Sequence, residues 1–80
     1  MKREELMQTI LQCLTTIAPE IDPASVEPAK LLREQVDLDS ADWLNFLVAL
    51  NAKLGIEIAD ADVAKLTTLD KLADYCGKRL

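Results

Sequence analysis

The sequence predicts an all-α fold, and three observations lead to that prediction. Half of the 80 residues are apolar while aromatic residues make up only 4%, a composition that favours a compact bundle of aliphatic-faced helices over disorder or an aromatic-rich β fold. Apolar residues recur at helical spacing in several parts of the chain. All three prolines fall in one stretch, 19–28. A chain this short forms one small core, so we expect a single domain over residues 1–80 without a deep active-site cleft.

The first predicted helix runs from about residue 3 to residue 17 and ends before Pro19. Its apolar stripe consists of Leu6, Ile10, Cys13, Leu14 and Ile17. A long connection over about 18–39 follows, because the prolines impose extended or turn geometry there. The segment "AKLLREQ" inside it can form one helical turn. Loops of this length in small domains are usually functional or disordered.

The second predicted helix runs from about Ser40 to Leu54 and stops at Gly55, which tolerates a left-handed cap. A short third helix over about 60–65 follows, capped by Asp60. A last helix over about 68–79 is capped by Thr68 or Thr67. Its apolar stripe consists of Leu69, Leu72, Ala73, Cys76 and Leu80.

The charge pattern narrows the classes of partner. The net charge is −5 and there is no histidine, so nucleic acid and anionic membrane surfaces are poor partners. Six acids and two bases fall within residues 18–39, and a basic protein partner would meet this part first. No apolar run reaches membrane-spanning length, and we expect a soluble, cytoplasmic monomer. Cys13 and Cys76 lie on apolar stripes without metal-ligand spacing, which indicates buried thiols.

The second helix carries two apolar stripes. Trp43, Phe46, Leu47, Leu50 and Leu54 form one arc suited to the core. The narrower second stripe, Ala41, Leu44 and Val48, has two interpretations. It can pack under the long connection as part of a helix buried on two sides, or it can stay exposed beside Ser40 as a docking patch.

The stretch "VDLDSADW" marks the start of this helix. Taken alone, it is a common helix start, with Asp39 as the N-cap and Asp42 in the first turn, where the helix dipole favours an acid. The alternative is that Ser40 is exposed there in order to be modified.

The stretch from Val36 to Leu69, "VDLDSADWLNFLVALNAKLGIEIADADVAKLTTL", resembles the acyl carrier protein family. The resemblance rests on Asp39-Ser40, on "ALNAKLGIEI" and on "AKLTTL", which occur in the order and at the spacing of that family. It implies a four-helix bundle of acyl-carrier type, with a long loop between helices 1 and 2 and a short third helix. It also implies that Ser40 carries 4′-phosphopantetheine donated by coenzyme A, with Asp39 as its neighbour in the motif.

The same resemblance implies a carrier that shuttles thioester-bound acyl or aminoacyl groups between enzymes, not an enzyme itself. The expected partners are a phosphopantetheinyl transferase and an acyl- or aminoacyl-loading ligase or synthase. The expected docking surface has an apolar centre at Leu44 and Val48. Its acids, set against a basic enzyme surface, are Asp39, Asp42, Glu57 and Asp60, with Asp62 as a further candidate.

Several residues depart from the family pattern. Ala41 stands where a leucine is usual, and Asn45, Asn51, Ala52 and Lys53 stand where acids are usual. Trp43 replaces a smaller residue and would fill the space where relatives shelter an acyl chain, so we expect a specialised freestanding carrier for short or polar cargo. The alternative is an unmodified helical adaptor or regulatory subunit. We expect no metal site and no catalytic residues, because no ligand cluster or phosphate-binding glycine loop is present.

Overall fold

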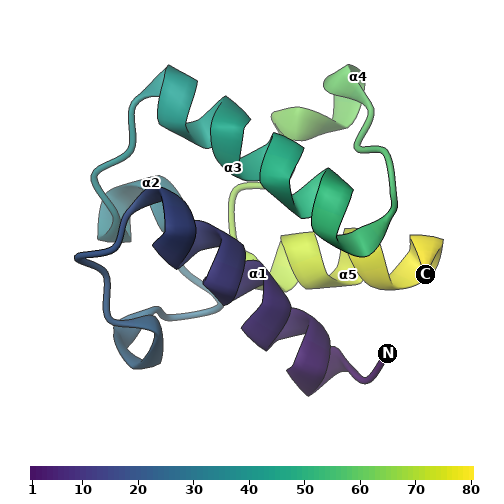
Figure 1. Ribbon diagram of the computed structural model, residues 1–80, viewed down its shortest axis with the longest axis horizontal. Helices are drawn as coiled ribbons and strands as arrows, with labels where there is room; N and C mark the ends of the chain where they lie inside the picture. Colours follow the sequence, from purple (N-terminus) through teal and green to yellow (C-terminus); the bar gives the residue numbers. More distant parts are fainter.

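The computed structural model describes residues 1–80 as an all-helical protein whose three long helices enclose the core (Figure 1). The helices are α1 (Arg3–Ile17), α2 (Leu32–Gln35), α3 (Ser40–Leu54), α4 (Asp60–Val63) and α5 (Leu69–Arg79), with a 3-10 turn at Pro23–Ser25. Helix α1 packs against both α3 and α5. The predicted all-α class is confirmed, and the turn expected within "AKLLREQ" is α2. No helix is long and apolar enough to cross a membrane.

The caps of the long helices follow from the sequence. The side chain of Asp39 accepts the N–H of Asp42 at the start of α3, and Gly55 ends that helix with φ +66°. Thr68, not Thr67, caps α5, with its hydroxyl accepting the N–H of Lys71 at 3.1 Å. Each cap supplies a partner for a backbone group that the helix leaves unpaired, or the left-handed geometry that a helix end requires.

The third expected helix is shorter than predicted. Helix α4 ends at Val63, after which the N–H groups of Lys65 and Leu66 bond three residues back, to Asp62 and Val63. This tighter pattern belongs to turns and 3-10 geometry, not to a continuing α-helix. The prediction that Asp60 caps this helix is also wrong. Ala59 occupies the cap position, and Asp60 is the first helical residue.

The core consists of 18 buried apolar residues drawn mainly from α1, α3 and α5. Most of the predicted stripe residues are among them, while Ile17 and Leu54 are only partly buried. Leu80, which was placed on the apolar stripe of the last helix, follows the last turn of α5 and is 51% exposed, so it lies outside the core. Cys13 and Cys76 are buried free thiols, as predicted.

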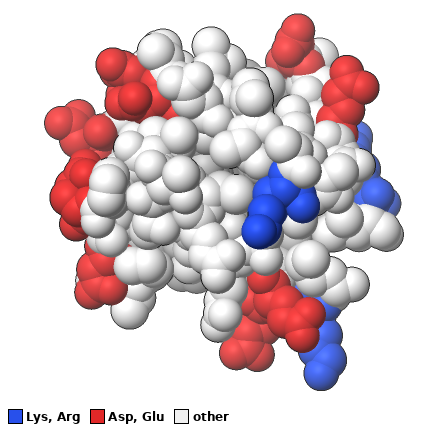
Figure 2. All heavy atoms as spheres, in the orientation of Figure 1, with Lys and Arg blue, Asp and Glu red and all other residues white.

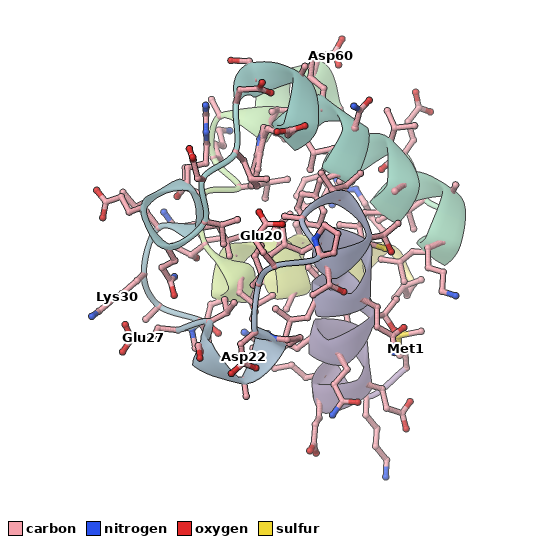
Figure 3. All side chains as sticks on the ribbon, turned by 60° about the vertical axis from the view of Figure 1, so that its left-hand side comes forward. Met1, Glu20, Asp22, Glu27, Lys30 and Asp60 are labelled. Carbon is pink, nitrogen blue, oxygen red and sulfur yellow. The ribbon has the colours of Figure 1, made fainter.

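The long connection between α1 and α3 is fastened by backbone and side-chain hydrogen bonds. The amide of Gln35 spans a loop, accepting the N–H of Glu27 at 2.6 Å and donating to its carbonyl at 2.9 Å. The N–H of Leu32 bonds to Thr67 O at 2.9 Å, and that of Asp70 to Pro28 O at 3.1 Å. The connection is therefore held to the chain around the start of α5. Figure 3 shows Glu27 and Lys30, two of its charged side chains, projecting away from the body of the protein.

Candidate functional site

Ser40 is the first residue of α3 and is exposed to solvent. Its hydroxyl makes no hydrogen bond with the protein, whereas Ser25, the other serine, donates to Asp22 Oδ2 at 3.1 Å. Directly before Ser40, Oδ1 of Asp39 accepts the N–H of Asp42 at 2.8 Å. The backbone that presents Ser40 is thus fixed by a cap while its hydroxyl remains free to react.

The backbone around Ser40 suits an attached phosphate. The N–H groups of Ser40 and Ala41 have no acceptor within the chain, because the cap serves Asp42 and the next bond runs from Trp43 to Asp39 O at 3.0 Å. Unpaired N–H groups and the positive end of the helix dipole favour an anion at this position. The residues present therefore fit a phosphodiester on the Ser40 oxygen.

The segment before Ser40 is anchored by two buried side chains, Val36 and Leu38. The guanidinium of Arg33 donates to the carbonyl of Leu38 at 3.3 Å and braces the same segment. Sequence reasoning did not identify this anchor. The signal in the sequence is the alternation of apolar and acidic residues in "VDLD", since a period of two indicates an extended, half-buried segment.

The second stripe of α3 is exposed. Leu44 is 57% exposed and Val48 65% exposed, and Ala41 lies on the surface as well. The interpretation that this stripe packs beneath the long connection is therefore wrong. Helix α3 has no charged residue between Asp42 and Lys53. Figure 2 shows an uncharged area over most of α3 and the later part of α1, with one basic side chain right of centre. Acids surround this area at the left edge, over the connection, at the upper right, over α4, and at the bottom, over the first turns of α1.

The acidic residues expected near the site differ in whether they are already paired within the protein. Asp39, Asp42, Glu57 and Asp60 take part in no ion pair. Asp62 is instead engaged within the protein, because Tyr75 donates to its Oδ2 at 2.8 Å and its side chain is only 26% exposed. Asp62 is thus placed to hold α4 in position rather than to meet a partner.

A groove of about 340 Å³ lies one helical turn from Ser40, where Trp43 forms part of the wall. Its other lining residues are Leu31, Arg33, Glu34, Val63, Ala64 and Thr67. Trp43 is 8% exposed, and the centroid of its ring lies 5.3 Å from the centroid of the Phe46 ring. None of the five depressions in the protein is lined by all three long helices. The tryptophan ring thus helps fill the interior and leaves the space beside it at the surface.

No group of three or more acidic, cysteine or histidine side chains is arranged to hold a metal ion. The groups that the structure brings together at this site are the Ser40 hydroxyl, the backbone N–H groups at the start of α3 and the nearby groove.

Comparisons with known proteins agree with this geometry. The family model described as "Phosphopantetheine attachment site" matches residues 8–76. The acyl carrier protein of Rubrobacter xylanophilus is 35% identical over 75 residues, which cover 94% of this chain and 91% of the relative. The acyl carrier protein of Thermosynechococcus vestitus is 25% identical over 80 residues, which cover all of this chain and 98% of the relative. A solved structure of the acyl carrier protein from Enterococcus faecalis covers both chains fully, with a TM-score of 0.77 and 26% identity.

The fold and the matched segment define a helical carrier whose cofactor is phosphopantetheine. More particularly, the chain belongs to the acyl carrier protein family. These matches favour a carrier over an unmodified adaptor.

Proposed function

We propose that Ser40 bears the phosphopantetheine arm and that the protein shuttles acyl or aminoacyl groups between partner enzymes. The observation that carries this proposal is the exposed Ser40 hydroxyl without a partner, next to the unpaired N–H of Ala41. Ser25 is a poor candidate, since its hydroxyl is bonded to Asp22 and it ends a 3-10 turn instead of beginning an α-helix.

Attachment requires a base and a metal from the modifying enzyme, because the chain has no histidine to activate Ser40. In the proposed reaction, the Ser40 oxygen attacks the phosphorus of coenzyme A that bears pantetheine. The new O–P bond forms as the pyrophosphate bond breaks, adenosine 3′,5′-bisphosphate leaves, and the serine proton passes to the base of the transferase. The N–H groups of Ser40 and Ala41 would then donate to the phosphodiester.

When attached, the arm supplies a terminal thiol that holds cargo as a thioester. The protein contributes the surface on which that cargo is presented, and in this proposal it has no catalytic activity of its own. Trp43 occupies interior space, so the groove it lines with Val63 suits a short or polar cargo better than a long chain enclosed among the helices. A tethered cargo is delivered at high local concentration once the carrier has docked.

Docking would place the apolar side chains of Leu44 and Val48 at the centre of the contact. Asp42, Glu57 and Asp60 are free of ion pairs and would meet a basic surface on a transferase, ligase or synthase. Such charges raise the rate of encounter more than the affinity. We also propose a monomer in the cytoplasm, in keeping with a net charge of −5 and two free thiols.

Intact mass spectrometry tests the attachment. Purified protein is incubated with coenzyme A, magnesium and a promiscuous phosphopantetheinyl transferase. The wild type and Ser25→Ala should gain the mass of one arm, and Ser40→Ala should gain none. If several transferases leave the wild type unmodified, or if Ser40→Ala is still modified, the proposal is wrong.

A second experiment tests the docking charges. Asp42→Lys should slow cargo loading by the cognate enzyme at low salt, and the difference should shrink at 1 M ionic strength, where the Debye length is about 3 Å. Glu4→Lys is the matched control, since it makes the same charge change on an exposed residue in the first turn of α1, away from the start of α3. Equal loading rates for Asp42→Lys and the wild type at low salt would contradict charge steering.

A further inference from the structure

A second surface groove is cationic, although the protein as a whole is acidic. It has a volume of about 570 Å³ and lies along α5 and the segment that precedes it. Four of the nine basic residues line it, namely Lys65, Lys71, Lys78 and Arg79. Asp74 is the only acid in its wall.

Arg3 removes the acidic charge that would otherwise oppose this groove. Its guanidinium is bound to the carboxylates of both Asp74 and Asp70, the two acids of α5. These carboxylates hold the pKa of Arg3 above its ordinary value, Asp74 through the larger effect. The acids of α5 are therefore already paired, and the groove retains its positive charge.

The bases of the groove are largely free. Lys71 and Lys78 take part in no ion pair. Lys65 and Arg79 form ion pairs only with Asp62, at 3.8 Å and 3.9 Å between nitrogen and oxygen, near the limit of an ion pair. Arg79 also donates to the carbonyl of Tyr75 at 3.4 Å and lies over its ring, so it is less free than the lysines. Two unpaired ammonium groups on one helix favour an anionic ligand between them.

The cationic groove adjoins the groove beside Ser40. Ala64 and Thr67 line both of them. On the Ser40 side of these two residues the wall includes the apolar side chains of Trp43 and Val63, and on the other side it includes the lysines of α5. Figure 1 shows the chain after α4 passing down to the start of α5. Ala64 and Thr67, the residues common to both grooves, belong to this stretch.

We propose that the cationic groove receives the anionic end of a cargo held on the arm, namely an acyl group with a terminal carboxylate. This inference rests on the proposed function, since the cargo must be tethered at Ser40. The alkyl part of such a cargo would lie against Trp43 and Val63, and its carboxylate would lie between Lys71 and Lys78.

Tethering decides which anions can use this groove. Ion pairs with exposed lysines contribute little free energy, so a carboxylate or phosphate free in solution is held weakly. A short flexible tether raises the effective concentration of its end to the millimolar range, which is enough to populate a weak site. The groove therefore distinguishes between cargoes already attached and does not recruit free anions.

The proposal is tested by NMR on the full ¹⁵N-labelled chain, with two arms that differ in charge. A promiscuous transferase attaches coenzyme A analogues that end in a succinyl or a butyryl group, each joined through a stable amide. The succinyl form should shift the backbone amide signals around Lys71 and Lys78, and the butyryl form should not. At least about half of that shift should be lost at 1 M ionic strength, where the Debye length is about 3 Å.

Variants assign the effect to the groove. The double variant Lys71→Gln, Lys78→Gln should lose most of the succinyl-specific shift in residues 64–79. Lys53→Gln, which removes the same charge at the end of α3, should retain it. Intact mass confirms that each variant carries the arm.

Three results would overturn the proposal. Equal shifts from the succinyl and butyryl arms would show that the groove ignores the carboxylate. A succinyl-specific shift that survives the double variant would place the carboxylate elsewhere. If a polyglutamate peptide shifts Lys71 and Lys78 while the succinyl arm does not, the groove belongs to an acidic protein partner instead. If intact mass shows that Ser40 gains no arm, the proposed function is wrong, and this inference fails with it.

Discussion

The phenol hydroxyl of Tyr75 on α5 donates a 2.8 Å hydrogen bond to Oδ2 of Asp62 on α4. The same phenol oxygen accepts the N–H of Ala59 at 3.3 Å, and the guanidinium of Arg79 lies 3.5 Å above the ring. Helix α4 has a single turn and no side-chain cap of its own. Since so short a helix is not stable by itself, this contact with α5 fixes the segment that forms one wall of the groove beside Ser40.

Removing the phenol oxygen should loosen that segment. We expect Tyr75→Phe to lower the free energy of unfolding by about 1 kcal/mol, because the side chain of Asp62 loses a donor in a partly buried place and the exposed N–H of Ala59 loses its acceptor. Amide hydrogen exchange in residues 59–64 should accelerate more than exchange in α1. In the Asp62→Ala background the same substitution should cost less, since the pair is already broken. Equal costs in both backgrounds would contradict this account.

The cap of α3 can be tested with neighbouring acids. Asp39→Ala should lower the free energy of unfolding by about 1 kcal/mol, because the N–H of Asp42 loses its acceptor. Asp39→Asn should be nearly neutral, since asparagine caps equally well. Asp37→Ala is the matched control, because Asp37 is exposed and its side chain accepts no helix N–H. Urea denaturation of the four proteins measures these differences, and equal losses for Asp37→Ala and Asp39→Ala would argue against the cap.

The two glycines should respond with opposite signs to the same substitution. Gly55→Ala places a side chain at φ +66°, where nothing lies within 4 Å of the new methyl group, so its cost of about 1 kcal/mol is conformational. Gly77 lies inside α5, and its new methyl group would meet Leu6 Cδ2 at an ordinary 3.6 Å. Gly77→Ala should therefore stabilise the protein by about 0.5–1 kcal/mol. Melting temperatures that move in the same direction would contradict this prediction.

The buried thiols should make the protein less stable at alkaline pH. Burial raises the pKa of Cys13 and of Cys76 above the ordinary value of 9.0, although Lys53 and Arg79 lower them slightly. Below pH 9 both the folded and the unfolded chain keep the thiol protons. Above it the unfolded chain loses them first, so the free energy of unfolding falls by up to about 1.4 kcal/mol per pH unit for each thiol.

A variant without one thiol isolates this effect from the titration of other groups. Wild type should be more stable than Cys76→Ala at pH 7, and that difference should narrow at pH 10, where only the wild type has the thiol to ionise. Urea denaturation at both pH values measures the two differences. A gap that stays constant or widens at pH 10 would show that burial does not shift the pKa of Cys76 in this way.

Local signals in the sequence were sufficient for the long helices and for the position of Ser40. The ranges of α1 and α3, the cap at Asp39 and the left-handed end at Gly55 follow from spacing and residue type within one helix. Asp60 was predicted to cap a helix but is the first residue of α4, because the exact end of a helix depends on backbone geometry that the local residue types do not fix. The single turn of α4 is shorter than its pattern indicated for the same reason.

Features that join distant parts of the chain were not predictable in this way. The role of Asp62 depends on Tyr75, thirteen residues further along the chain. The charge of the cationic groove depends on Arg3, about seventy residues before its partner Asp74. The exposure of Leu44 and Val48 was left open by the sequence, because an apolar stripe does not show whether another segment covers it. Each of these outcomes depends on how α1, α3 and α5 pack.

The start of α1 lies against α5, where Arg3 is bound to Asp70 and Asp74. The N- and C-termini are on the same side of the molecule, away from the start of α3 (Figure 1). A fluorescent label, an affinity tag or a neighbouring enzyme domain joined at either end would therefore leave Ser40 unobstructed. The fold would in this way suit a position within a larger polypeptide, with both linkers leaving from one side and Ser40, the proposed attachment site, at the start of α3 away from them.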